Sequence, residues 1–126
     1  MKINGHRIGH GVNLAGANLA KTDLNDAKLF RANLTGADLS GANLFGADLV
    51  GANLTGADLS GANLFRADLT GANLTSVNLS RANLFETNFT NADLTSANLF
   101  QTNLNDAKIS GANLTGARMV WGDIHE

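Results

Sequence analysis

The sequence predicts an all-β fold: a four-sided parallel β-helix, a solenoid of about six coils. Three observations predict it. An apolar residue stands at every fifth position from Leu14 to Ile124, which makes 23 units without an insertion. A small residue, most often Ala, lies two positions before each of these central residues. Like residues also recur at intervals of 20, the length of four units.

A period of five fits neither a regular α-helix nor one continuous strand. Five residues advance about 500° around an α-helix, so successive leucines would spiral over every face. On a continuous strand, an odd period would send successive leucines to opposite faces. Within a unit, however, the small residue and the central residue are two apart, so a short extended piece points both inward. A turn must follow each piece, and a Gly two residues after many centres supports that turn.

The residue directly after each centre indicates how many units make one coil. Residues of the same type recur there 20 positions apart, as Thr (35, 55, 75, 95, 115), Ser (40, 60, 80) and Phe (45, 65, 85). A parallel ladder favours such stacking of like side chains one strand spacing apart. We therefore expect a square coil of four units around a core of Leu lined by Ala, in which Phe89 replaces one Leu.

Both ends depart from the repeat. Ile3 and Ile8 are five residues apart, but Ile8 and Leu14 are six apart. We therefore expect residues 1–11 to form an irregular first coil or cap, and residues 12–126 to form the β-helix, with its C-terminal end from about residue 117. Near that end stand Met119, Val120 and Trp121, which either plug the last coil or form a homodimer contact.

Composition narrows the class of protein. The chain has no Cys, which excludes disulfides and thiolate metal sites. It has no apolar run of the length of a signal peptide or a membrane span, so we expect a cytoplasmic protein without membrane contact. A net charge of −2 without a basic patch predicts no direct binding of nucleic acid.

No motif predicts catalysis, a cofactor site or a metal site. His6 and His10 have the spacing of a metal-binding pair on a helix, but glycines flank and interrupt them and no third ligand is near in sequence. Ser and Thr occupy repeat positions, where hydroxyls bond to turns or to one another. We expect a non-enzymatic structural or protein-interaction scaffold whose partner the sequence does not name.

Two sets of residues form the candidate interaction surface. Phe45, Phe65 and Phe85 should stack as an outward column, either as an apolar interface stripe or as a stabilising ladder of rings. Four carboxylates should stack in pairs on opposite faces, either for solubility or as acidic strips that meet a basic partner. These pairs are Asp38 with Asp58 and Asp48 with Asp68.

Units such as residues 37–41 (Ala-Asp-Leu-Ser-Gly) and 52–56 (Ala-Asn-Leu-Thr-Gly) resemble the A(D/N)LXX signature of the pentapeptide-repeat family. The resemblance covers about residues 12–126. In its regularity the sequence is similar to cyanobacterial members of the family. It implies a right-handed quadrilateral β-helix, the hand that parallel crossovers generally adopt.

The same resemblance implies an alternative function. Some members mimic DNA, bind type II topoisomerases such as DNA gyrase and confer fluoroquinolone resistance. That role needs a strongly acidic rod. Here the negative field is interrupted at Arg66, Arg81, Lys108 and Arg118.

Overall fold

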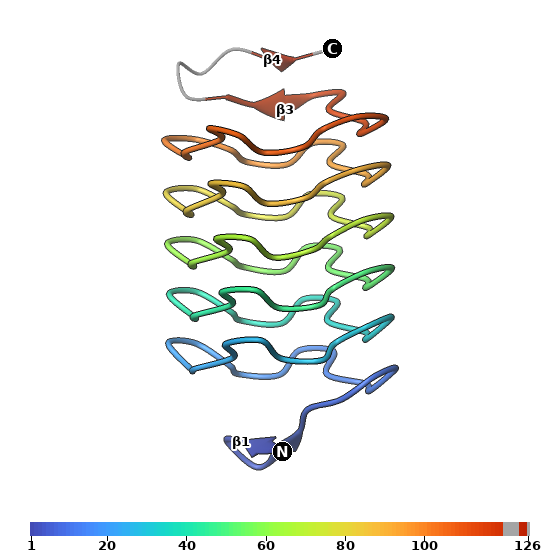
Figure 1. Ribbon diagram of the computed structural model, residues 1–126, viewed down its shortest axis with the longest axis vertical. Coiled ribbons are helices and arrows are strands. Elements are labelled where there is room, and N and C mark those ends of the chain that lie inside the picture. Colours follow the sequence, from blue (N-terminus) through green and yellow to red (C-terminus); the bar gives the residue numbers. More distant parts are fainter. Residues whose placement is uncertain (120–123, 126) are drawn as a thin grey trace.

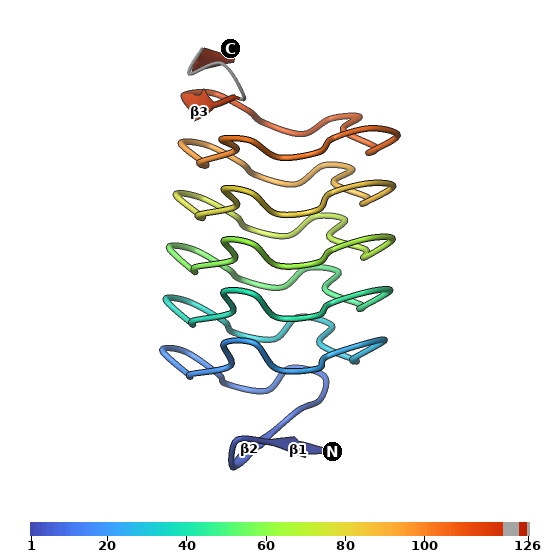
Figure 2. The same ribbon diagram turned by 90° about the vertical axis from the view of Figure 1, so that its left-hand side faces the viewer.

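In the computed structural model, which describes residues 1–119 and Ile124–His125, the chain winds into an all-β solenoid of stacked coils (Figures 1 and 2). Parallel bridges join residues 20 apart, from Asn13–Asn33 to Asn98–Arg118. The predicted all-β solenoid is therefore confirmed, and each coil contains four five-residue units.

Regular strands occur only at the two ends of the described chain. β1 (Lys2–Ile3) pairs antiparallel with β2 (His6–Arg7), and β3 (Ala117–Arg118) pairs antiparallel with β4 (Ile124–His125). Between these hairpins the coils are joined by isolated bridges, because the chain turns after each short extended piece. In each unit the bridged residue is the one before the central apolar residue.

A tight turn ends each unit. Ala57 N–H donates to the carbonyl of Leu54, three residues earlier, at 2.9 Å. Between them, Gly56 has φ = 68°, as the third residue of a type II turn requires. Eleven non-glycine residues at the equivalent corner position in other units have φ of 57° to 61°. The turn thus dictates the backbone at every corner, and Gly is the residue that adopts it without strain.

The Asn or Asp before each centre also serves the turn. Asn53 Oδ1 accepts hydrogen bonds from Thr55 N–H at 3.0 Å and from the Thr55 hydroxyl at 2.7 Å. Asn63 Nδ2 donates to Asn43 Oδ1 in the neighbouring coil at 3.3 Å. These residues therefore cap the turns within a coil and link adjacent coils.

The core is a column of leucines lined by alanines. Leu34, Leu54 and Leu74 are fully buried in successive coils, and Phe89 is fully buried in place of a Leu. Thr87, which replaces an Ala in the same unit as Phe89, is also buried and donates its hydroxyl hydrogen bond to the Leu64 carbonyl at 2.7 Å. Each buried polar side chain thus keeps a partner, as burial demands.

A hairpin covers the first coil. Its turn residues, Asn4 and Gly5, both have positive φ (52° and 80°), as a two-residue type I′ turn requires. Ile8 is buried, and Ile3 packs partly buried against the core. The division of the chain at residue 11 stays a prediction.

At the other end, Met119 packs partly buried against the core. Val120 and Trp121 lie outside the described residues, so the plug and the dimer contact both stay predictions. Within the described chain, nothing has the length and apolar character of a membrane-spanning helix.

Candidate interaction surface

Phe45, Phe65 and Phe85 stack in successive coils, and we call them the phenylalanine ladder. The ring centroids are 5.3 Å apart for Phe45–Phe65, with 30° between ring planes, and 5.4 Å apart for Phe65–Phe85, with 21°. All three side chains are half-buried. The rings therefore form a regular aromatic column whose outer edges reach solvent.

A column of Asn side chains holds the ladder in place. The N–H of Phe65 donates to Asn63 Oδ1 at 3.1 Å, and the other two rings have the same bond to Asn43 and Asn83. Along the axis, Asn83 Nδ2 donates to Asn63 Oδ1 at 3.4 Å. The aromatic column is thus fixed at its backbone before any partner binds.

Arg66 connects the ladder to the neighbouring corner. Its guanidinium carbon lies 4.9 Å from the centroid of the Phe65 ring, within the range of a cation–π contact. Its Nε donates to Glu86 Oε1 of the next coil at 2.7 Å. The Arg66 side chain is 62% exposed, and a pair so exposed contributes about 0–1 kcal/mol to stability. The main effect of the pair is to orient the guanidinium.

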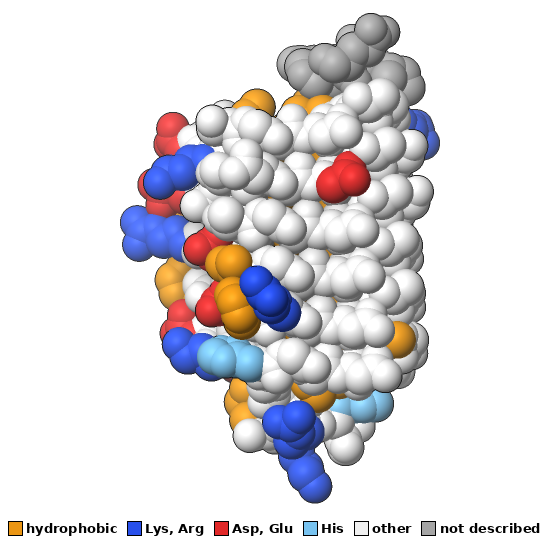
Figure 3. Space-filling view, turned by 90° about the vertical axis from the view of Figure 1, so that its right-hand side faces the viewer, with side chains coloured by type: hydrophobic (Ala, Val, Ile, Leu, Met, Phe, Trp, Pro, Cys, Tyr) orange, Lys and Arg blue, Asp and Glu red, His pale blue; other side chains and the backbone are white. Residues whose placement is uncertain are grey.

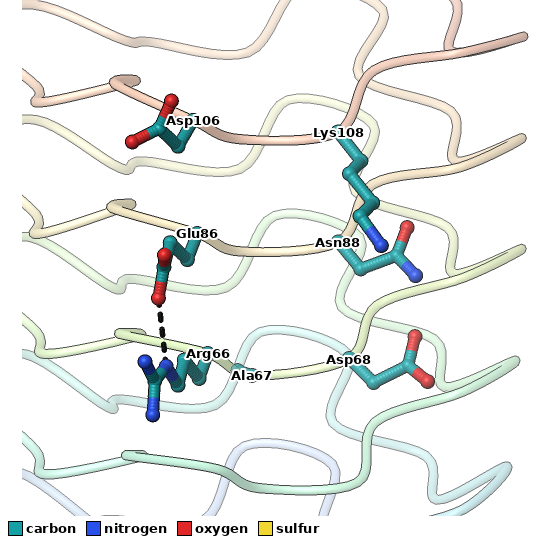
Figure 4. Close-up of a pocket in the computed structure, with 7 residues that line it drawn as sticks. All are labelled: Arg66, Ala67, Asp68, Glu86, Asn88, Asp106 and Lys108. Atoms are coloured by element: carbon teal, nitrogen blue, oxygen red, sulfur yellow. Dashed lines mark hydrogen bonds and ion pairs between the residues drawn. The ribbon is translucent and has the colours of Figure 1, made fainter.

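Beside the ladder lies a shallow pocket of about 490 Å³ (Figure 4). One wall consists of the corner residues Arg66, Glu86 and Asp106, and the facing wall carries Asp68, Asn88 and Lys108, with Ala67 between them. Both walls therefore present both signs of charge. We call the phenylalanine ladder together with this pocket the ladder surface.

Four consecutive residues build the centre of the ladder surface. Phe65 supplies the middle ring, Arg66 the cation at the corner, Ala67 the inward-facing floor and Asp68 the carboxylate of the far wall. Phe65 and Asp68 were each predicted from the sequence as candidate surface residues. The shared corner column of Arg66, Glu86 and Asp106 was not predicted, although their spacing of 20 indicates it.

The predicted acidic pairs lie as neighbours across adjacent coils. Asp38 bridges Asp58, and Asp48 bridges Asp68 two units away around the coil. Asp68 is the only one of the four that lines the pocket. Lys28 bridges Asp48, and Lys108 lies two coils beyond Asp68. The column that contains Asp48 and Asp68 therefore has a Lys at each end.

These carboxylates act as acceptors for their own turns. Asp38 Oδ1 accepts the Ser40 hydroxyl at 2.7 Å and the Ser40 N–H at 3.0 Å. The bond from the Ser40 hydroxyl, helped by the N–H bond, holds the pKa of Asp38 below its ordinary value against a small opposing effect of desolvation. Such a carboxylate is a weak base, which suits a turn cap better than proton transfer.

The two N-terminal histidines lie in different local surroundings. His6 belongs to β2, and His10 packs edge-on against Phe30 with ring centroids 5.8 Å apart. Among the residues that the structure describes, no three His, Asp or Glu side chains gather closely enough to hold a metal ion.

Comparison with known proteins agrees with the repeat geometry. The family model for pentapeptide repeats matches residues 10–44, 42–81, 62–100 and 82–119. No curated protein sequence matches the chain significantly.

Solved structures of similar fold include three proteins. HetL from the cyanobacterium Nostoc sp. strain PCC 7120, a pentapeptide-repeat protein involved in regulating heterocyst differentiation, is 32% identical over 91% of this chain with a TM-score of 0.52, and this chain covers 65% of its length. Rfr23 from the cyanobacterium Cyanothece 51142 is 33% identical over 86% of this chain and 88% of its own, with a TM-score of 0.50.

QnrB1, a plasmid-mediated fluoroquinolone resistance protein, has a TM-score of 0.57 over 92% of this chain and 75% of its own. Its identity is only 19%, so the likeness concerns the fold alone. With repeat matches from residue 10 to residue 119 and cyanobacterial structures about one-third identical, the chain belongs to the pentapeptide-repeat family.

Proposed function

We propose that this chain is a non-enzymatic scaffold that binds a protein partner through the ladder surface. The solenoid in this proposal is right-handed and four-sided, with about six coils. The observation that carries it is the stacked phenylalanine ladder with Arg66 oriented over its middle ring beside a charged pocket. The whole surface spans several coils of one rigid rod.

The chemistry of the ladder surface suits a protein interface. Aromatic residues and Arg are enriched in the cores of protein interfaces. They contribute most of the binding energy when a partner covers them. The rings are half-buried at rest, so covering their outer edges removes further apolar surface from water. Because Asn43, Asn63 and Asn83 hold the ladder and the Glu86 contact holds Arg66, a partner orders few side chains on binding.

A regulatory role for such a scaffold has a precedent in fold and sequence. HetL is involved in regulating heterocyst differentiation and shares one-third of its aligned residues with this chain. We extend a regulatory role, rather than the particular process, to the present chain.

The topoisomerase-binding alternative receives less support from the charges. A DNA mimic needs continuous negative columns, whereas here Lys28 and Lys108 end the column of Asp48 and Asp68, and Arg66 occupies the adjacent corner. We expect no change in gyrase supercoiling when the purified protein is titrated to large molar excess. Dose-dependent inhibition would instead establish the alternative.

Site-specific photo-crosslinking tests the proposal. A photoreactive phenylalanine analogue at position 65 should yield a discrete protein adduct in native lysate, and Arg66→Glu should remove that adduct. The matched control places the analogue at Thr55, which lies two units away around the coil. Equal labelling from positions 55 and 65, or an adduct that survives Arg66→Glu, would rule out the ladder surface as the binding site.

A further inference from the structure

One side of the solenoid combines few charges with the same pair of polar residues in almost every coil. Its outward residues form an Asn column and a Thr column, which we call the Asn–Thr face. The columns are Asn33, Asn53, Asn73, Asp93 and Asn113, and Thr35, Thr55, Thr75, Thr95 and Thr115. In Figure 3, charged side chains gather on the left of the molecule, whereas the broad right-hand part is nearly free of them.

The Asn–Thr face is a two-dimensional lattice. Leu54 is fully buried, so the residues on either side of it, Asn53 and Thr55, both point outward. Two residues along an extended piece span about 6.7 Å, and adjacent coils lie about 4.8 Å apart. The same pair of side chains repeats at these intervals over five successive coils, with Asp93 as the one departure.

Hydrogen bonds hold this lattice in one conformation. The Thr55 hydroxyl donates to Asn53 Oδ1 at 2.7 Å, and the Thr75 hydroxyl donates to Asn73 Oδ1 at 2.8 Å. Because each Thr proton is directed at its neighbouring Asn, the Thr methyl and the hydroxyl oxygen have the same orientation in each coil. A regularly spaced ligand therefore meets groups that are already ordered.

The turns alone do not require this uniformity. On the next side of the coil, Ser40 with Asp38 and Ser80 with Asn78 make the same capping bonds. The corner between these two sides carries only Gly and Ser, at positions 16, 36, 56, 76, 96 and 116, so nothing bulky stands along this edge of the face. The corner on the opposite edge carries Gly except at Arg31 and Asn91. The Asn–Thr face thus carries a single charge in its two columns, at Asp93, and is more regular than folding needs.

We propose that the Asn–Thr face binds ice. Water molecules in ice repeat along one crystal axis at a spacing close to that of stacked coils, and a flat array of hydroxyl, amide and methyl groups at that spacing can join the lattice. Charged groups hold water in orientations that do not fit a crystal, and the two columns carry only the carboxylate of Asp93. A protein partner would gain nothing from such strict repetition.

Thermal hysteresis and ice-crystal shape measure this activity directly, with ice itself as the probe. The purified chain should depress the freezing point below the melting point and shape growing crystals. Thr75→Tyr, which places a bulky ring in the middle of the face, should abolish both effects. Ser60→Tyr, the matched change on the adjacent side, should preserve them. Asp93→Asn completes the uncharged columns and should increase the hysteresis.

Thermal unfolding of each variant verifies that it is folded, and Thr55→Tyr, on the same face, replaces Thr75→Tyr if that variant does not fold. The proposal is overturned if the folded wild-type chain neither shifts the freezing point nor shapes ice at millimolar concentration. Equal activity of the wild-type chain and the folded Tyr variant on the face would overturn it as well. Retention on crystalline cellulose without any effect on ice would assign the face to a different lattice.

Discussion

At the scale of single residues, the corner position two after each centre is the most constrained in the molecule. Its backbone is left-handed whether the residue is Gly61 (φ = 67°) or Ser76 (φ = 59°). For a residue other than Gly, this conformation costs about 1–2 kcal/mol. The frequent Gly at this position in the repeat is therefore a direct consequence of turn geometry.

Exchanging residues at this position should give opposite effects. A Cβ on Gly61 would meet nothing within 4 Å, so Gly61→Ala adds only backbone strain and should destabilise the protein by about 1 kcal/mol. Ser76→Gly removes strain but loosens the unfolded chain, which leaves a net stabilisation of about 0.5 kcal/mol. Urea unfolding followed by circular dichroism measures both. Changes of the same sign would contradict this explanation of the corner.

The capping carboxylates predict a pH dependence of stability. The Thr95 hydroxyl, followed by its N–H, holds the pKa of Asp93 below its ordinary value, as the Ser40 groups do for Asp38. Because the folded pKa is below the unfolded value of about 3.9, this stabilisation is complete above that pH and is lost as pH falls through the folded pKa.

Asn occupies the equivalent position in other coils, so Asp38→Asn with Asp93→Asn keeps the caps but removes their titration. The thermal midpoint of this double variant should fall less steeply than that of the wild type between pH 5 and pH 2. Parallel curves would show that the two caps do not contribute to the acid sensitivity.

At the scale of elements, the phenylalanine ladder acts as a unit. Phe65 stacks on two rings, whereas Phe45 stacks on one ring of the ladder. Each ring pair contributes about 0.5–1.5 kcal/mol beyond the area it buries.

Phe65→Ser should therefore lower stability more than Phe45→Ser, with the extra loss about that of one ring pair. Thermal unfolding of the two variants makes the comparison, and Thr55→Ser on another side serves as the control. Equal losses at positions 45 and 65 would mean that ring stacking adds nothing to burial, and would leave the ladder only its binding role.

The sequence predicted the elements well where the period of five continues. Central residues such as Leu54 and Phe89 point inward because the turns repeat without an insertion, and stacking follows from the interval of 20. The N-terminal hairpin was not predicted, although Asn4-Gly5 is a strong signal for a two-residue turn. This signal is local and lies where the period of five is broken, so the repeat itself does not indicate it.

The candidate site was predictable only in part. The stacking of Phe45, Phe65 and Phe85 follows from their spacing, whereas the contact of Arg66 with Phe65 and Glu86 depends on the direction a side chain takes from a left-handed corner. That direction is a three-dimensional property. The pocket likewise results from two charged columns on either side of an inward-facing Ala, which no single unit reveals.

At the scale of the whole molecule, both ends carry an antiparallel hairpin, but the apolar residues near them differ in exposure. The first coil is covered by the β1–β2 hairpin, with Ile8 buried, whereas Ile109 near the other end is 47% exposed. An exposed large apolar residue at an open end favours association. We propose a homodimer contact at the C-terminal end that includes Met119, Val120 and Trp121.

Sedimentation velocity tests this association. The wild type should sediment as a dimer at high concentration, and Trp121→Ala should shift it towards the monomer. Glu substituted for Ile109 should have the same effect, because a charge at the open end opposes apolar contact. A wild-type chain that stays monomeric at high concentration excludes the dimer.

Both proposed surfaces require the chain to return to the same side every 20 residues, and paired cysteines test this most directly because the native chain has none. Thr55→Cys with Thr75→Cys places two thiols one coil apart, within the Cα separation of about 4.4–6.8 Å that a disulfide spans. Mild oxidation should link this pair and leave the pair at positions 55 and 65, on different sides, as free thiols. Linkage of 55 to 65, or no linkage of 55 to 75, would contradict the coil on which the ladder surface and the Asn–Thr face both depend.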